Sequence, residues 1–339
     1  MRRPFALLAA TLLTAALAAT LLTAALAVPA SAADNDDGDE GFTINDPRIT
    51  ESSGLAASRQ HPGVYWTHND SDDGPYLYAV DSSTGDTVAR LTLTGIGTPR
   101  DVEAISVGPG NRLFVADVGD NLGGTWPYVW LYELPEPKRL QDATVQATQY
   151  VVKYADGPRD AEAMVVHPRT GRVYLIDKHE DGGHLYEGPE KLSPEGDNVF
   201  RPIAPVELWA TDAALSPDGQ DLAVRGYFGG IHYAWNGGEL QRKGRLSVPL
   251  QGQGESVTYS ADGSRLLFGS EGEQSGVVSR PAPGADDEGG SSGGPGSRAD
   301  GGDSASGDGK DDSVKVGGAV VVAVLVAALF GLSRRRRKG

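Results

Sequence analysis

A short two-strand pattern recurs along this chain and constrains its fold more than any other feature. In the clearest copy, residues 99–107 and 112–117 are rich in apolar and β-branched side chains and flank the turn Gly108-Pro109-Gly110-Asn111. This composition predicts a β-hairpin, with acidic residues at its open end. A close copy covers residues 158–177, and looser copies begin near Ser53, Ala213 and Glu255.

The spacing of the copies indicates how the hairpins assemble. Positions Ser53, Glu103, Glu162, Ala213 and Glu255, taken as equivalent, are 50, 59, 51 and 42 residues apart. This period suits four-stranded propeller blades better than most solenoid units. Each unit contains two further strand candidates, except the fifth, which lacks one. The unassigned segment Phe42–Ile49 is predicted to supply it and so to close the ring without an exposed edge.

We therefore predict an all-β fold, a β-propeller of five four-stranded blades. Six blades, with an extra one hidden in the long third unit, is the alternative.

The two ends of the chain differ from the middle in composition. Residues 1–32 have the basic start, apolar core and small-residue site of a secretory signal peptide, with an uncleaved anchor as the alternative. Residues 33–41 form an acidic leader that we expect to be flexible, and 284–313 form a Gly/Ser/Asp-rich linker that we expect to be disordered.

A second apolar run, within 314–333, precedes the basic tail 334–339. It predicts one transmembrane helix with the C-terminus in the cytoplasm, because basic clusters stay inside. A buried core helix is the alternative. Residues 42–283 are then an extracellular domain at the cell membrane, a topology similar to surface proteins of high-GC Gram-positive bacteria.

Composition excludes several classes of function. The chain has no cysteine, so disulfides and cysteine-ligated zinc are excluded. Its net charge of −16 argues against a nucleic-acid partner, and its basic cluster, at the C-terminus, is expected to contact anionic lipid. We expect the protein to be a monomer.

Hairpin geometry predicts where the polar residues gather. The start of the first strand and the end of the second lie at the same edge of an antiparallel hairpin. One face of the ring should therefore collect the candidate residues His68, Arg100, Asp101, Glu103, Asp117, Asp120, Asn121, Arg159, Asp160, Glu162, Asp177, His179 and Glu255.

Three hypotheses describe this acidic face. In the first, Glu103, Glu162 and Glu255, with Asp101 and Asp160, bind a metal, and calcium suits such all-oxygen ligands. In the second, Arg100 and Arg159 neutralise the glutamates through ion pairs within each blade. In the third, an organic ligand binds to Arg100, Arg159, His68, His179, Asp117, Asp120, Asn121 and Asp177.

Several motifs resemble those of known propellers. The turns Ser216-Pro217-Asp218-Gly219 and Ser260-Ala261-Asp262-Gly263 resemble those of WD-repeat-like and TolB-like propellers. The Glu-Ala strands together with Asp117-Val118-Gly119-Asp120-Asn121 resemble bacterial exported propellers of the phytase-like and esterase-like group. The resemblance covers about residues 42–283.

The resemblance implies a propeller fold and metal-dependent hydrolysis of phosphoesters or lactones. Propellers host many unrelated functions, and no serine nucleophile motif accompanies the histidines. Two functions therefore stay open. The chain is predicted to be a membrane-anchored extracellular module that binds a ligand or protein, and the alternative is a calcium-dependent, phytase-like hydrolase.

Overall fold

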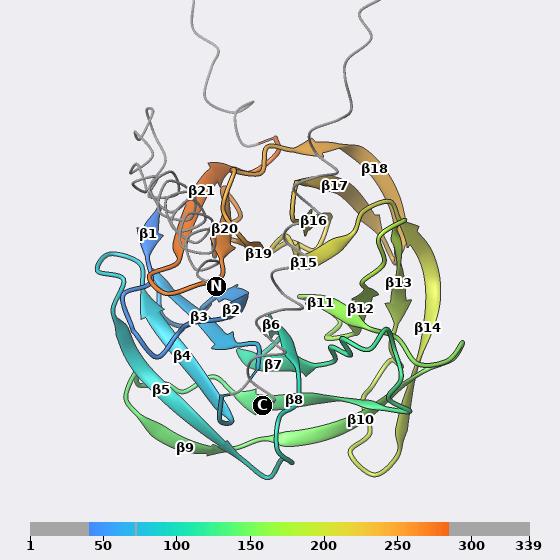
Figure 1. Ribbon diagram of the computed structural model, residues 1–339, viewed down its shortest axis with the longest axis horizontal. Helices are drawn as coiled ribbons and strands as arrows, with labels where there is room; N and C mark the ends of the chain where they lie inside the picture. Colours follow the sequence, from blue (N-terminus) through green and yellow to red (C-terminus); the bar gives the residue numbers. More distant parts are fainter. Residues whose placement is uncertain (1–40, 72, 285–339) are drawn as a thin grey trace, which may run out of the picture. The chain divides into compact units, whose positions relative to one another are not determined.

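A computed structural model describes residues 41–71 and 73–284, and these residues form 21 β-strands (Figure 1). The predicted signal peptide, linker, transmembrane helix and basic tail lie outside the described residues. Within residues 41–71 and 73–284, no helix has the length and hydropathy needed to cross a membrane.

The strands form antiparallel meanders, and most strands within a meander follow one another directly in the sequence. The first contains β2 (Ser52–Ala57), β3 (Val64–Asn69), β4 (Tyr76–Asp81) and β5 (Thr87–Thr94). The second contains β6 (Val102–Gly108), β7 (Arg112–Asp117), β8 (Val129–Pro135) and β10 (Thr148–Tyr154). The third contains β11 (Ala161–Val166), β12 (Val173–Asp177), β13 (Gly183–Glu187) and β14 (Asp197–Val206).

Two further meanders follow. The fourth contains β15 (Ala210–Leu215), β16 (Asp221–Gly226), β17 (Gly229–Asn236) and β18 (Glu239–Leu246). The last contains β19 (Gly254–Tyr259), β20 (Arg265–Ser270) and β21 (Gly276–Pro281), with β1 (Phe42–Thr43) at its outer edge.

The first strands of the meanders surround a common axis. β2 contacts β6, and contacts continue through β11, β15 and β19 back to β2 (Figure 1). The core lies between neighbouring meanders. For example, Trp66 and Leu91 of the first pack with Tyr132 and Leu134 of the second, where their apolar surface is removed from water. This ring of radially arranged meanders is a β-propeller.

The N-terminal segment lies where it was predicted, beside the last meander. Phe42 pairs with Val277 in antiparallel register, and the Ile44 amide donates to the Ser275 carbonyl at 2.9 Å. Ile44 and Ile49 are buried in a cluster that also contains residues of β2 to β4 and of β20 and β21. The segment therefore joins the last meander to the first.

The outer edge of the first meander carries an additional strand. β9 (Ala143–Gln146) pairs in parallel with β5, whereas β10 belongs to the second meander. β10 also pairs in parallel with β14 of the third meander. These pairings cover outer edges that would otherwise be open to other chains.

Candidate metal and ligand site at the acidic mouth

A β-bulge interrupts each first strand near its start. In the second meander the register changes from Val102 opposite Asp117 to Ala104 opposite Ala116, which leaves Glu103 unpaired. Glu162 is left unpaired in the same way in the third meander. A bulge redirects the side chain that it releases, here toward the axis. The corresponding positions in the other meanders are Ser53, Thr211 and Glu255.

This register corrects one predicted equivalence. In the fourth meander the shift falls between Ala210 and Asp212, so the equivalent residue is Thr211 and the assignment of Ala213 was wrong. Thr211 is buried, and its hydroxyl donates to the Glu255 carbonyl at 2.8 Å. The sequence could not reveal this because the acidic residue that stands at the bulge in the second, third and fifth copies is replaced by threonine in the fourth.

Two more sets of equivalent residues border the same end of the axis. The residue that follows the second strand is Asp70, Val118, Lys178, Tyr227 or Glu271 in successive meanders. The residue that precedes the first strand is Glu51, Asp101, Asp160, Trp209 or Gln253. We call the group Asp70, Asp101, Glu103, Asp160, Glu162, Lys178 and Glu255 the acidic mouth.

Three carboxylates of the acidic mouth converge within metal-binding distance. One oxygen each from Asp70, Asp101 and Glu103 lies within 4.8 Å of the other two. Asp101 and Glu103 are 5% and 3% exposed. The Oδ1 atom of Asp70 is buried, and no donor in the described part of the chain reaches it. An all-oxygen set of this kind suits calcium.

The loop after β7 closes tightly over this triad. A Cβ atom at Gly119 would lie 2.3 Å from Oε1 of Glu103 and 2.8 Å from Oδ2 of Asp101, so the close approach requires glycine. The Asn121 amide donates to Asp101 Oδ2 at 2.7 Å, and the Ser53 hydroxyl donates to Glu103 Oε2 at 3.2 Å. These contacts fix the direction of two carboxylates.

Burial raises the pKa of several carboxylates in the acidic mouth, namely those of Asp70, Glu103, Glu162 and Glu255. It raises the pKa of Asp70 and of Glu103 well above their usual range, and neighbouring carboxylates raise both further. Burial also raises the pKa of Glu162 to about 7, although Lys178 opposes this shift. The pKa of Glu255 rises to about 8, again through burial and the charge of Glu162.

Lys178 is the cation of the acidic mouth, and the sequence interpretation missed it. Its Nζ atom lies 2.6 Å from Oε1 of Glu162, and its side chain is 16% exposed. Burial alone would lower the pKa of Lys178, but Glu162 and Glu103 raise it above its ordinary value. Its position directly after β12, equivalent to Asp70 after β3, is the signal that could have identified it.

The two arginines do not neutralise the glutamates, and the hypothesis that they do was wrong. The Arg100 guanidinium stacks on Trp126 and Trp130, with its carbon 4.0 and 3.7 Å from the ring centroids. Arg159 pairs with Asp156 at 2.7 Å and lies 3.6 Å from Asp177. Arg100 therefore finds its partners on the rings of the second meander, and Arg159 finds them on Asp156 and Asp177.

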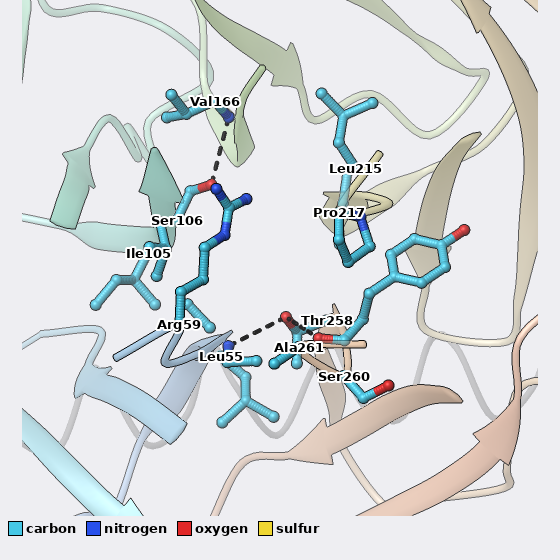
Figure 2. Close-up of a pocket in the computed structure, with 16 residues that line it drawn as sticks. Leu55, Arg59, Ile105, Ser106, Val166, Leu215, Pro217, Thr258, Ser260 and Ala261 are labelled. Carbon is cyan, nitrogen blue, oxygen red and sulfur yellow. Dashed lines mark hydrogen bonds between the residues drawn. The ribbon is translucent and has the colours of Figure 1, made fainter. Parts of the chain in front are cut away.

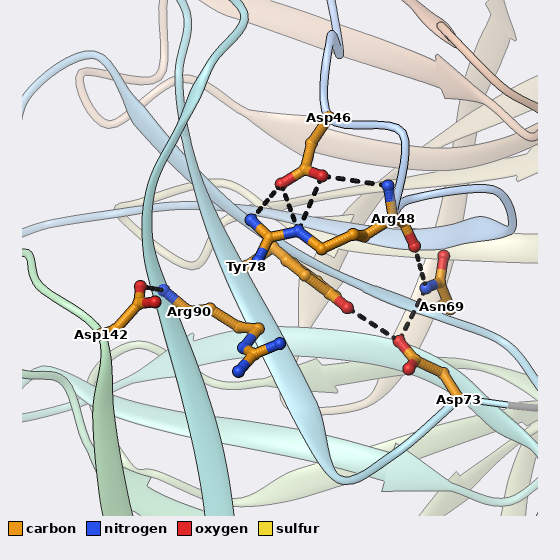
Figure 3. A network of polar contacts seen from close by, with 7 residues as sticks. All are labelled: Asp46, Arg48, Asn69, Asp73, Tyr78, Arg90 and Asp142. Carbon is orange, nitrogen blue, oxygen red and sulfur yellow. Dashed lines mark hydrogen bonds and ion pairs between the residues drawn. The ribbon is translucent and has the colours of Figure 1, made fainter.

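Several residues that were predicted to bind a ligand accept hydrogen bonds from backbone amides. Asp117 accepts the amides of Arg100 and Asp101 at 3.1 and 3.0 Å, and burial raises its pKa. Its equivalent Asn69 accepts the amides of Thr50 and Glu51, and donates to Asp73 in the network of Figure 3. The third equivalent, Asp177, accepts the His184 amide at 2.5 Å.

Asp120 and Asp160 also have backbone partners. Asp120 accepts the Trp126 amide at 2.6 Å, while its own amide donates to Asp160 Oδ1 at 2.8 Å. Asp120 therefore shapes the loop after β7, and Asp160 ties that loop to the third meander.

The two candidate histidines lie in different environments. His68 is 1% exposed, and burial lowers its pKa to about 4. It packs against Gly54, where a Cβ atom would lie 2.6 Å from its Nε2 atom. His179 is exposed at the rim and lines a hollow of about 380 Å³ with Asp160, Lys178 and Trp209. Of the two, His179 is accessible to a ligand.

The opposite end of the axis offers less chemistry. A small hollow of about 50 Å³ there is lined mainly by apolar side chains such as Leu55, Ile105 and Leu215, with Arg59 beside them (Figure 2). Ser106 and Thr258 accept backbone amides of Val166 and Ala57, so their hydroxyls serve the fold. The lining of this hollow contains no carboxylate. The reactive groups of the axis are therefore gathered at the acidic mouth.

Comparison with known proteins finds solved structures of distant similarity. No family model and no curated protein sequence matches it. The soluble aldose sugar dehydrogenase of Escherichia coli in its apo form is similar in structure, with 11% identity, 71% of this chain and 99% of that chain covered, and a TM-score of 0.46. The PQQ-bound aldose sugar dehydrogenase of Streptomyces coelicolor has 9% identity, 71% and 97% coverage, and a TM-score of 0.43.

A gluconolactonase from Xanthomonas campestris is similar at 17% identity, with 71% of this chain and 89% of that chain covered and a TM-score of 0.44. Likenesses this distant transfer no activity, and the resemblance to phytase-like propellers stays a prediction. What the acidic mouth does must follow from its own geometry.

Proposed function

We propose that the acidic mouth binds Ca²⁺ and that the protein is a calcium-dependent hydrolase of phosphoester or lactone substrates. The observation that carries the proposal is the convergence of Asp70, Asp101 and Glu103 around a buried Asp70 oxygen that no donor in the described residues reaches. Buried carboxylates without compensation are costly. A hard divalent cation removes this cost, because it takes oxygen ligands from several side chains at once.

The proposed scaffold is a five-bladed propeller. The third unit supplies only β11 to β14 to its meander, which argues against a sixth blade hidden there. β1 supplies the strand that the last unit lacks. The first strand of each of the five meanders then places its bulged residue at the same end of the axis.

The residues around the metal ligands suit hydrolysis. The ion would polarise the carbonyl or phosphoryl oxygen of the substrate. Glu162, with a pKa of about 7, takes a proton from the attacking water at neutral pH. Glu255, with a pKa of about 8, holds a proton that it gives to the leaving-group oxygen. Lys178 orients Glu162 and stabilises the anionic transition state.

Metal dependence tests the proposal. Calcium at a hundredfold excess over its dissociation constant should stabilise the fold by about 2.7 kcal/mol, measured by calorimetric melting. Glu103→Gln should remove this increment and the hydrolysis of 4-nitrophenyl phosphate or δ-valerolactone. The control Glu239→Gln changes an exposed residue of β18 and should alter neither. A wild-type melt that is indifferent to calcium would refute the metal site.

A binding module without turnover is the second candidate. Leu122 is 75% exposed in the loop that also carries Asn121, beside the triad. Calcium binding with no hydrolysis of either substrate would favour this function.

We also propose that the domain is held outside the cell by the apolar run within 314–333. Protease added to intact cells should then release a soluble fragment that contains residues 42–283. Complete protection of the domain would contradict this topology.

A further inference from the structure

A row of aromatic side chains extends outward from the acidic mouth on the fourth meander. The rings of Trp209 and Tyr227 meet edge to face, with centroids 5.3 Å apart at 82°. The ring of Phe228 follows at 6.3 Å from that of Tyr227. Phe228 is 74% exposed, which is unusual for a phenylalanine. We call Trp209, Tyr227 and Phe228 the aromatic shelf.

The shelf borders a hollow of its own. This hollow has a volume of about 400 Å³, within the range of small-molecule pockets. Leu208, Ile231, Leu246 and Val248 add aliphatic surface to its lining. The polar residues Glu207, Arg242, Arg245 and Ser247 also line the hollow, and the three rings of the shelf form its aromatic side. The surface therefore favours a flat apolar ring, which stacks on aromatic side chains.

The shelf is continuous with the acidic mouth. Trp209 lines both this hollow and the one that contains Asp160 and Lys178. The Nζ atom of Lys178 lies 5.6 Å from the centroid of the Tyr227 ring. A ligand whose ring rests on the shelf therefore places its adjoining group toward Lys178 and the carboxylates.

We propose that the aromatic shelf binds the aryl group of an aryl ester or aryl phosphoester whose reactive group enters the acidic mouth. The assignment of the reactive group rests on the proposed hydrolytic function. The aryl site itself stands on the shelf and its hollow. Arg245, which lines the same hollow, adds a positive charge that favours anionic aryl compounds.

Binding of two probes tests the inference. Titration calorimetry of the full chain with calcium, in the Glu162→Gln background so that neither probe is hydrolysed, should show that 1-naphthyl phosphate binds at least about tenfold more tightly than methyl phosphate, since a stacked ring adds contact energy. Phe228→Ala should weaken the binding of 1-naphthyl phosphate about fivefold to tenfold and leave methyl phosphate unchanged, and Trp209→Ala should weaken the binding of 1-naphthyl phosphate by a similar factor. The exposure of Phe228 means that its replacement leaves the core intact.

Leu250→Ala is the matched control, because Leu250 is a fully exposed apolar residue outside the hollow. It should change the affinity for neither probe. Equal or unmeasurable affinities for the two probes, or glucose 1-phosphate binding as tightly as 1-naphthyl phosphate, would overturn the aryl site. If calcium and hydrolysis fail but the ring preference and its loss in Phe228→Ala persist, the hydrolytic function is wrong and the aryl site stands.

Discussion

The pH dependence of stability gives the sharpest test of the acidic mouth. Glu255 is 5% exposed, and its pKa is about 8 in the folded protein against 4.5 for a free glutamate. At a pH between 4.5 and 8, Glu255 keeps its proton in the folded chain and has lost it in the unfolded chain. The stability that this proton confers is therefore complete below pH 4.5 and is lost as the pH rises through 8.

The magnitude follows from the shift. The difference of 8 − 4.5 is 3.5 pH units, which at about 1.36 kcal/mol per unit corresponds to a loss of about 5 kcal/mol. Glu162 contributes in the same direction up to its pKa of about 7. Glu255→Gln resembles the protonated acid in shape and cannot ionise. Its free energy of unfolding should thus fall much less than that of the wild type between pH 4.5 and 8.

Urea unfolding at several pH values, with a chelator to remove calcium, measures both curves. Stability of the wild type relative to Glu255→Gln should decline by several kcal/mol across this range. Glu239→Gln, which alters an exposed glutamate of β18, should follow the wild type. Parallel curves for the wild type and Glu255→Gln would show that Glu255 ionises freely and that the acidic mouth is hydrated.

Two further predictions concern the loop after β7 and the closing strand. Gly119→Ala would place a Cβ atom 2.3 Å from Glu103 Oε1, so it should weaken calcium binding about 10- to 100-fold, as for other residues that position metal ligands. Gly229→Ala, which meets open space, should leave the affinity unchanged, and titration calorimetry compares the two. Deleting residues 42–49 removes the buried Ile44 and Ile49 and exposes β21, so the melting temperature should drop by at least ~5 °C. An unchanged melting temperature would mean that the last meander is stable without β1.

The propeller fold was predictable because its signals are local. Turns such as Ser216-Pro217-Asp218-Gly219 and the apolar strands beside them specify hairpins within about fifteen residues, and the repeat then specifies the ring. The parallel pairing of β9 with β5 was not predictable. It joins residues about fifty positions apart, and no pattern in residues 143–146 differs from that of an ordinary outer strand.

The site was predictable only in part, for a related reason. Hairpin geometry predicted that Glu103, Glu162 and Glu255 lie at one end of the axis. They do, and burial and the charge of Glu162 there raise the pKa of both Glu103 and Glu255. It could not choose the partner of Arg100, because both a bulged glutamate and the Trp126 and Trp130 rings are within reach of a long side chain. Packing decided in favour of the rings.

The five meanders repeat one structure but carry different residues at equivalent positions of the acidic mouth. The position after the second strand is occupied by Asp70, Lys178 and Tyr227 in the first, third and fourth meanders, so one structural position supplies a carboxylate, a cation and an aromatic ring. If every copy carried a carboxylate, the mouth would hold cations alone. Because Lys178 and Tyr227 interrupt the ring, the mouth presents carboxylates to the proposed metal on one side and a cation and an aromatic ring on the other. The departures from the repeat, rather than the repeat itself, therefore identify the residues with which a search for the substrate should begin.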